Sequence, residues 1–298
     1  MALDRRSFLA LAAAGTVAAR FPQALLGARG ALEFSTLRRN VGIFSLRGGT
    51  IGWLINGDGV LVVDSQFADT APTLLAGVRE RSSRPIDVLI NSHHHPDHTG
   101  GNQVLREATE RIVAHTRSAE NQRMSARQRN VEDQQAYPDT TFDDTWNVQI
   151  GDETVRAKHY GPAHTGGDVA IHFERANVVH MGDLINNRGY ANVDGPSGAS
   201  VHGWIRVLES IAAEYPADAI YVFGHGEAPH GVTGARADLL YQRDYFSAVI
   251  DAARRARAEG KSREETVALP ALPGFENTGG TVARLGLALG LAYDELGR

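Results

Sequence analysis

Short apolar runs separated by turn-forming residues dominate the first part of the chain. Glycine pairs and Gly-Asp-Gly sequences between them are turn signals, and runs of this length and composition are typical of strands. The predicted strands are residues 34–39, 42–46, 50–56 and 60–63. Because they follow one another with only short turns, we expect them to form an antiparallel meander.

The pattern then changes to alternating helices and strands, which indicates β-α-β units. Helical spacing covers residues 70–81 and begins again at 102–107, and strands are predicted at 86–91 and 112–115. A second set follows, with strands at 148–150, 154–159, 169–173, 177–181 and 219–223 and helices at 200–215 and 235–259. The two halves resemble each other. We therefore expect an α/β fold, a four-layer αββα sandwich with functional residues on loops along one edge.

Two further segments are predicted to lie outside this sandwich. Residues 117–136 are polar on every side of a helix, which predicts an exposed helix, either a lid or a simple surface element. The helical segments 263–268 and 281–296 are expected to pack as a C-terminal helical cover. One domain, residues 31–298, should contain all of these elements.

The N-terminus has the features of an export signal. Asp4-Arg5-Arg6-Ser7-Phe8-Leu9 precedes an apolar stretch, residues 9–19, which matches the twin-arginine pattern and is short for a membrane span. An amphipathic first helix is the alternative interpretation. We expect residues 1–30 to be a signal peptide cleaved between residues 24 and 31, the twin-arginine export machinery to be a partner, the location to be periplasmic, and no stable membrane anchor to remain.

Composition narrows the chemistry. The net charge is −5 and the pI about 6.2, and the basic residues are scattered, so nucleic acid is not an expected partner. The chain contains no cysteine, no G-x-S-x-G sequence and no P-loop, which excludes thiol nucleophiles and leaves serine and phosphate-cradle chemistry without a motif.

A cluster of histidines follows the predicted strand at residues 86–91. The sequence there is N-S-H-H-H-P-D-H-T-G-G, which places His93, His95, Asp97 and His98 in one loop. Protonated imidazoles this close together would repel one another, whereas a divalent cation binds neutral imidazole and ionised carboxylate. The loop therefore predicts a metal site, and its shape leaves room for two adjacent metal positions.

The pattern H-x-H-x-D-H resembles the signature of the metallo-β-lactamase superfamily. The other parts of that pattern occur in order: His164 in G-P-A-H-T-G-G-D, Asp183 in N-V-V-H-M-G-D and His225 in Y-V-F-G-H-G. The resemblance covers about residues 34–230 and implies the metallo-β-lactamase fold. It also implies that His93, His95 and His164 hold one metal, that Asp97, His98 and His225 hold the other, and that Asp183 bridges them, as in the glyoxalase II and lactonase branches.

Other polar residues have less specific signals. Asp64 resembles the family aspartate that orients the metal loop without touching metal, and a strand-end turn is its alternative role. In the loop after Asp183, Asn186, Arg188 and Tyr190 are candidate substrate contacts or parts of an ordinary connection. His230 is a further candidate at the substrate mouth. Structural roles are expected for His94, His115, His159, His172 and His180, and the role of His202 stays open.

The resemblance implies an enzyme that acts on a small-molecule substrate. The cofactors would be two Zn²⁺ ions per chain, with iron as the other possibility, and a metal-bridging hydroxide oriented by Asp97 would attack a carbonyl group. Thioesters, lactones and β-lactams are the substrate classes in view. Two alternatives stay open: a non-haem iron persulfide dioxygenase on the same fold, and a metal-binding accessory protein with little turnover.

Overall fold

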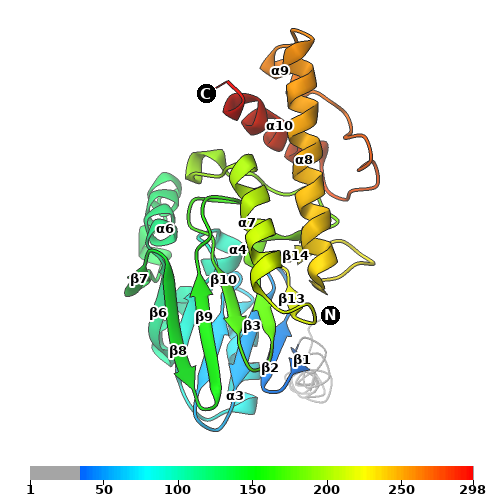
Figure 1. The fold of residues 1–298 in the computed structure, drawn as a ribbon. Helices are drawn as coiled ribbons and strands as arrows, with labels where there is room; N and C mark the ends of the chain where they lie inside the picture. Colours follow the sequence, from blue (N-terminus) through cyan, green and yellow to red (C-terminus); the bar gives the residue numbers. More distant parts are fainter. Residues whose placement is uncertain (1–33, 298) are drawn as a thin grey trace, which may run out of the picture.

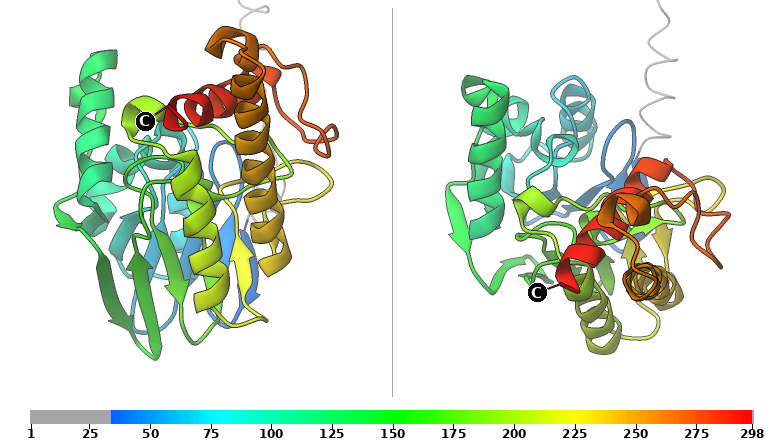
Figure 2. Two further views of the ribbon diagram at one scale, coloured as in Figure 1. Left: turned by 45° about the horizontal axis from the view of Figure 1, so that its top comes forward. Right: turned by 90° about the horizontal axis from the view of Figure 1, so that it is seen from above.

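A computed structural model describes residues 34–297, and the segment interpreted as a signal peptide lies outside the described residues. Among the described helices, none is both long enough and apolar enough to cross a membrane. The chain forms two mixed β-sheets that pack face to face with helices on their outer sides, which is the predicted αββα arrangement (Figures 1 and 2).

The first sheet has seven strands in sequence order. Its antiparallel half is β1 (Phe34–Arg38), β2 (Val41–Phe44), β3 (Ile51–Ile55) and β4 (Val60–Val63), which confirms the expected meander. Its parallel half adds β5 (Ile86–Asn91), β6 (Thr109–His115) and β7 (Thr140–Phe142). Helices α3 (Ala71–Arg81) and α5 (Asn102–Leu105) cover the outer face of this sheet through Leu74, Val78 and Leu105.

The second sheet has six strands in the order β15-β13-β11-β10-β9-β8. Their bounds are β8 (Thr145–Ile150), β9 (Glu153–Lys158), β10 (Ala170–Phe173), β11 (Val178–His180), β13 (Ile220–Val222) and β15 (Thr233–Gly234). Alternating residues of β9 and β10, such as Val155, Ala157 and Ile171, face Leu61, Val63 and Ile90 of the first sheet across a shared apolar core. This alternation is the period of two that places every second strand residue on one face.

The outer face of the second sheet carries the long helices. Helices α7 (Val201–Glu214) and α8 (Arg236–Ala258) pack on it, and α10 (Val282–Glu295) lies across the upper ends of both (Figures 1 and 2). A short helix, α9 (Arg263–Val267), lies between α8 and α10 in the chain. Leu285, Leu289 and Ala292 of α10 are fully buried against this layer, so the C-terminal segment belongs to the core.

The structure corrects the prediction for residues 117–136. The helix there, α6 (Thr116–Arg129), ends earlier and is not exposed on every side, because Asn121, Gln122 and Ala126 are buried. The amide of Asn121 donates to Ser197 O at 3.0 Å and that of Gln122 to Ala136 O at 3.3 Å. Hydrogen bonds satisfy these buried polar groups, which a hydrophobic pattern cannot reveal. After α6 comes a single 3₁₀ turn, Glu132–Gln134.

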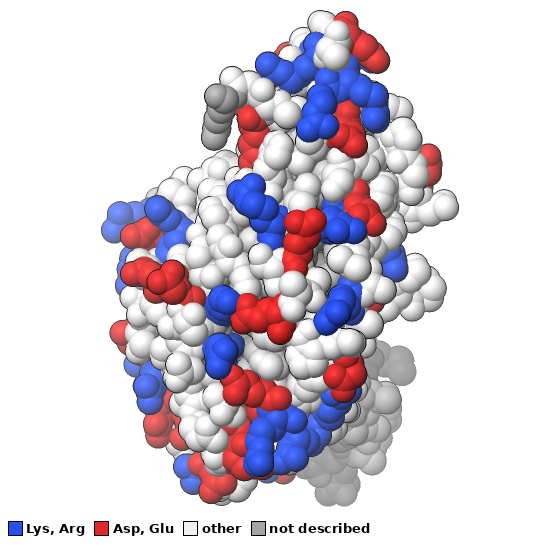
Figure 3. All heavy atoms as spheres, in the orientation of Figure 1, with Lys and Arg blue, Asp and Glu red and all other residues white. Residues whose placement is uncertain are grey.

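Charged side chains are interspersed over the surface. On the face shown in Figure 3, basic and acidic groups are intermixed. Several charged side chains of the molecule pair, as Lys158 does with Glu214. Exposed pairs of this kind contribute little to stability.

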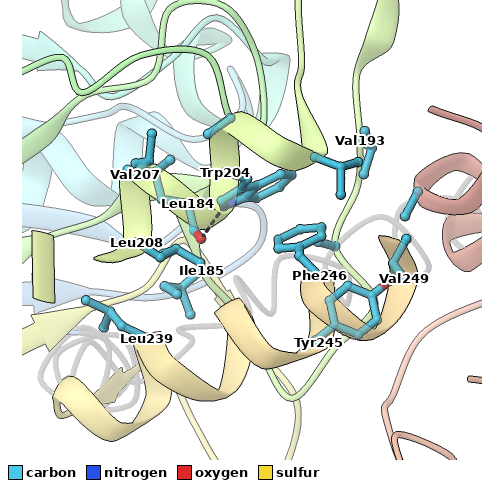
Figure 4. Packing of buried hydrophobic residues seen from close by; sticks show 14 of the residues in the cluster. Leu184, Ile185, Val193, Trp204, Val207, Leu208, Leu239, Tyr245, Phe246 and Val249 are labelled. Atoms are coloured by element: carbon cyan, nitrogen blue, oxygen red, sulfur yellow. Dashed lines mark hydrogen bonds between the residues drawn. The ribbon is translucent and has the colours of Figure 1, made fainter. Parts of the chain in front are cut away.

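The largest buried aromatic group of the helical layer surrounds Trp204. Its indole stacks against Phe246 with ring centroids 4.3 Å apart and donates to Leu184 O at 2.9 Å (Figure 4). The ring also lies 5.6 Å from the imidazole of His164. Trp204 therefore ties α7 and α8 to the loop that follows β11.

We predict that Trp204→Ala lowers the free energy of unfolding by about 3–5 kcal/mol, because it removes a fully buried aromatic ring and leaves Leu184 O without its donor. Denaturant unfolding in metal-free buffer measures this. The control is Leu287→Ala, at a side chain 51% exposed on α10, which should change stability by less than about 0.5 kcal/mol. A similar, small loss for both variants would contradict the role assigned to Trp204.

Candidate metal centre

Seven predicted ligands converge at the carboxyl ends of the central strands. His93 and His95 follow β5, and the short helix α4 (Pro96–Thr99) carries Asp97 and His98. From the second half come His164, between β9 and β10, Asp183 in the 3₁₀ turn Gly182–Leu184 after β11, and His225 at the start of β14 (His225–Gly226). Each sheet thus contributes part of the centre, which matches the expected placement on loops along one edge.

The side chains form two adjoining groups. His93, His95, His164 and Asp183 offer ligand atoms within 4.8 Å of one another, and so do Asp97, His98 and His225. In the second group, His225 Nε2 lies 3.1 Å and His98 Nε2 3.8 Å from Asp97 Oδ2. These are the two ligand sets that the resemblance implied.

Asp183 lies between the two groups. Its Oδ2 is 3.6 Å from His164 Nε2 and 3.9 Å from His93 Nε2. Its Oδ1 is 3.0 Å from His98 Nε2 and 3.4 Å from His225 Nε2. One carboxylate oxygen therefore faces each group, which is the disposition of a bridging ligand.

The donor atoms fit a cation better than they fit one another. His93 Nε2, His98 Nε2 and Asp183 Oδ1 are buried and lack a partner in hydrogen-bonding geometry. His95 Nδ1 and His164 Nε2 are 2.9 Å apart. The other ring nitrogen of each faces an oxygen acceptor, Asp194 Oδ2 for His95 and Asn192 O for His164, so the single N–H of each neutral imidazole points away from this contact. Buried polar atoms are normally satisfied, and imidazole nitrogens and carboxylates are ligands that zinc prefers. These residues fit a centre for one or two divalent cations.

Burial and mutual repulsion control the protonation of the first group. Burial is the main cause that lowers the pKa of His93 well below its usual value and that of His164 to about 4. Neighbouring imidazoles lower both further. Neutral imidazole is the form that coordinates metal, so His93 and His164 are held in their ligand form.

Asp183 has the opposite effect on the second group. Burial works to raise the pKa of Asp183, but His225 and His98 outweigh it and hold the carboxylate ionised. Asp183 in turn is the main cause that raises the pKa of His225 to about 9. For His98, burial lowers the pKa, and Asp183 and Asp64 together raise it above the usual value. Without a cation, protons bound to His98 and His225 would balance the negative charge here.

Asp64 fixes the orientation of the metal loop. It is fully buried after β4, accepts hydrogen bonds from Ser92 N and Ser92 Oγ at 2.7 Å each, and lies 2.8 Å from His98 Nδ1. With its Nδ1 engaged there, His98 presents Nε2 to the centre. Asp64 thus lies against both the backbone of the metal loop and the ring of His98.

Asp194 occupies an equivalent position beside His95, and the sequence did not predict it. Its Oδ2 is 2.9 Å from His95 Nε2, which leaves Nδ1 of that ring facing His164. Burial favours the protonated form of Asp194, but the hydrogen bond with His95 outweighs it and lowers the pKa of the carboxyl. No local pattern marks this residue, because the loop that brings it to His95 is 99 residues away in the chain.

Close backbone packing joins the segments that carry Asp183 and His225. β12 (Asn186–Asn187) pairs in parallel with β14, with Asn186 opposite His225. Gly224 N donates to Gly182 O at 2.7 Å, and a Cβ at Gly224 would overlap Asp183 Oδ1. Glycine is therefore required before His225, because the backbone approaches the bridging carboxylate directly.

The remaining histidines pack outside the two ligand groups. His94 Nε2 lies 3.2 Å from Ser197 Oγ, and with His95 and Asp194 it forms a third set of possible ligand atoms. His115 and His159 stack at 4.1 Å, and His180 Nε2 lies 2.9 Å from Thr50 O. The other rings contact protein groups as well: His172 packs on Tyr215, and His202 pairs with Glu295.

A cavity of about 260 Å³ opens onto the centre. The residues that line it are His95, Pro96, Asp97, His164, Asp183, Asn186, Asn192, His225 and Arg284. Of the candidate substrate contacts, only Asn186 is among them, and its amide donates to Tyr190 O at 3.3 Å. Asn192 and Arg284 were not expected, because the tertiary fold alone brings them here.

The other three candidates lie away from this cavity. Arg188 pairs with Asp238 at 3.1 Å and stacks on Tyr241, with its guanidinium carbon 3.6 Å from the ring centroid. Tyr190 is buried, with its ring 6.0 Å from that of Tyr245. His230 is exposed on the loop after β14. Packing against α8 therefore accounts for the positions of Arg188 and Tyr190.

Comparison with known proteins agrees with this geometry. The family model of the metallo-beta-lactamase superfamily matches residues 46–225, more than half of the chain, and the chain belongs to that superfamily. It is a metal-dependent hydrolase of that superfamily.

Its relatives differ from one another in activity. The chain is 23% identical to the metallo-beta-lactamase type 2 of Bacillus cereus over 72% of this chain and 82% of that protein. It is 26% identical to a hydroxyacylglutathione hydrolase of Rhodospirillum rubrum over 72% of each. A stereoselective inverting sec-alkylsulfatase from Pseudomonas sp. has a similar fold, with a TM-score of 0.69, 14% identity, and coverage of 86% of this chain and 49% of that one. The shared fold alone does not select a substrate.

We predict that Asp64→Asn weakens zinc binding by about 10–100-fold, because an amide lacks the charge that holds His98 and has one acceptor oxygen for three donors. Backbone strain should not contribute, since φ of +66° at this position suits asparagine. Competition with a chromogenic chelator measures the affinity. Asp58→Asn, in the exposed turn between β3 and β4, is the matched control. Equal zinc affinities of the two variants would show that Asp64 does not support the centre.

Proposed function

We propose that this chain is a dinuclear zinc hydrolase that cleaves a carbonyl substrate, namely a thioester, a lactone or a β-lactam. The observation that carries the proposal is the position of Asp183 between two separate ligand groups, one oxygen toward each. Two cations bound side by side would supply a Lewis acid and a water of lowered pKa. The names of the type 2 metallo-beta-lactamase and the hydroxyacylglutathione hydrolase support the β-lactam and thioester classes.

The protein groups around the cavity have distinct tasks in this proposal. Asp97 is one-quarter exposed, with Oδ2 toward His225, so its other oxygen can accept a hydrogen bond from a water at the cavity floor. Burial raises the pKa of Asp97, but His225 and His98 outweigh this effect and keep the carboxylate ionised and able to accept. Asp64 and Asp194 hold the imidazoles of His98 and His95 in fixed orientations. Pro96 and Asn192 border the space in which the carbonyl group would lie.

Completeness of the second ligand group favours hydrolysis over the iron oxygenase alternative. A single iron would need only one group, and Asp97, His98 and His225 would then have no cation to bind. Their convergence within 4.8 Å, together with the buried and unpartnered Nε2 of His98, is better explained by a second cation.

We predict near two zinc ions per chain after purification without chelator or added metal, and hydrolysis of at least one member of a panel of thioesters, lactones and β-lactams. Asp97→Asn should reduce kcat by about 100-fold or more, because a neutral amide is a weaker acceptor for the water and a weaker ligand for the second cation than a carboxylate. Elemental analysis and steady-state kinetics measure these quantities, with Asp133→Asn on the exposed 3₁₀ turn as control. Near one iron per chain would replace this proposal with persulfide oxidation. Two zinc ions without turnover on the whole panel would indicate an accessory protein.

We also propose that the twin-arginine machinery exports the protein to the periplasm and that a small molecule is its substrate there. The support is the Arg5-Arg6 pair followed by an apolar stretch, and export of an already folded protein would let it take up metal beforehand. In a bacterial host, the protein should be recovered in the periplasmic fraction, and replacing Arg5 and Arg6 together with lysine should keep it in the cytoplasm. Periplasmic recovery of the double variant would contradict this route.

A further inference from the structure

Two hollows meet at Arg284. The cavity over the metal centre adjoins a second one of about 290 Å³, and both are lined by Asn186, His225 and Arg284. The second hollow is bordered by Leu46 and Val232 on its apolar side and by Glu227 on its polar side. A molecule whose reacting group lies at the metal centre can therefore extend past Arg284 into the second hollow.

Arg284 stands at an unfavourable place for helix stability. It lies in the first turn of α10, where the helix dipole favours acidic residues and disfavours cations, and no acidic residue is present in that turn. The Thr281 side chain does not cap the helix either. The neighbouring Leu285 is fully buried, so α10 is fixed and Arg284 stays at the cavity wall. The stability of α10 therefore does not explain why an arginine occupies position 284.

The segment that carries Arg284 is held at both ends. Before α10, Gly279 N donates to Arg188 O and Tyr190 N donates to Gly279 O, each at 2.8 Å, which joins this segment to the loop after Asp183. At the far end, Glu295 accepts from His202 N at 3.1 Å and lies 2.7 Å from His202 Nδ1. The backbone that carries Arg284 is thus anchored to the loop after Asp183 and to α7.

The charge of Arg284 has no protein partner at ion-pair distance. Among the described residues, no carboxylate lies within 4.0 Å of its guanidinium nitrogens, whereas Arg188 pairs with Asp238 and Arg263 with Asp294. The acids in its own cavity, Asp97 and Asp183, are directed at the histidines. Cations bound there would neutralise these two carboxylates. The cavity would then have a net positive charge, with Arg284 at its rim.

We propose that Arg284 binds a carboxylate of the substrate, so that the preferred substrate is an anionic carbonyl compound whose carboxylate lies between the metal cavity and the second hollow. A guanidinium group can donate two parallel hydrogen bonds to a carboxylate, which gives both affinity and orientation. This inference rests on the proposed function, because it assumes that the reacting carbonyl lies at the metal centre. It assigns a substrate contact to α10, whereas the sequence suggested Arg188 as a candidate.

Two thiols of matched length test the inference by binding alone. The thiol group of 3-mercaptopropionate and of 3-mercaptopropionamide can bind the metal centre equally, and only the first carries a carboxylate. Titration calorimetry on the metal-loaded full chain should show the acid binding about 10–100-fold more tightly than the amide. Arg284→Met, which keeps the length of the apolar stem, should reduce this ratio to about one, and Arg284→Lys should restore part of it.

The control is Arg254→Met, at an arginine on the exposed face of α8 that pairs with Asp251. It should leave the ratio unchanged, and thermal unfolding of all three variants checks that they are folded. Equal binding of acid and amide to the unmodified protein, binding of neither, or an unchanged ratio in Arg284→Met would overturn the inference. The proposed function fails separately, if the acid is preferred through Arg284 but no member of the carbonyl panel is hydrolysed.

Discussion

The structure depends on the contact between the buried carboxylate of Asp183 and the imidazoles on either side of it. Four imidazole nitrogens lie within 3.9 Å of its two oxygens, and three of these histidines are almost completely buried. Imidazoles crowded in this way repel one another when protonated, and a buried carboxylate is costly without a counter-charge. The arrangement is stable only if protons or cations compensate the carboxylates, and it favours cations because the imidazoles of His93 and His164 are held neutral. The electrostatics of the site therefore favour a bound metal cation.

The rest of the fold holds this arrangement rigid. Asp64 and Asp194 fix two imidazoles through the nitrogens that face away from the centre, and such outer contacts tune metal affinity as well as geometry. Thr50 N donates to Gly224 O, which joins the first sheet to the strand end that carries His225. Neither half of the sandwich has a complete ligand set. The centre therefore exists only when the two sheets pack together through their apolar core.

Substrate selection has a different origin in this molecule. Relatives with different named activities share the fold, so the two ligand groups define a type of chemistry and not a particular substrate. In this chain, the cavity wall is completed by α10, which lies outside the segment matched by the family model. Arg284 brings a positive charge to that wall. We infer that the helical layer, and not the metal loop, determines which substrates fit.

Local residue patterns were enough to indicate the chemistry of the centre and the order of the elements around it. His93, His95, Asp97 and His98 are close in the chain, so their local spacing was sufficient to indicate a metal site, and strands such as β4 and β5 have clear apolar runs. Tertiary structure decided the contacts between distant segments. It placed Asp194 on His95, moved Arg188 and Tyr190 into packing with α8, brought Arg284 to the cavity, and buried polar residues of α6. The reason is physical: a residue pattern records local periodicity and ligand type, whereas the partner of a polar side chain depends on which distant backbone the packed core brings within hydrogen-bonding distance.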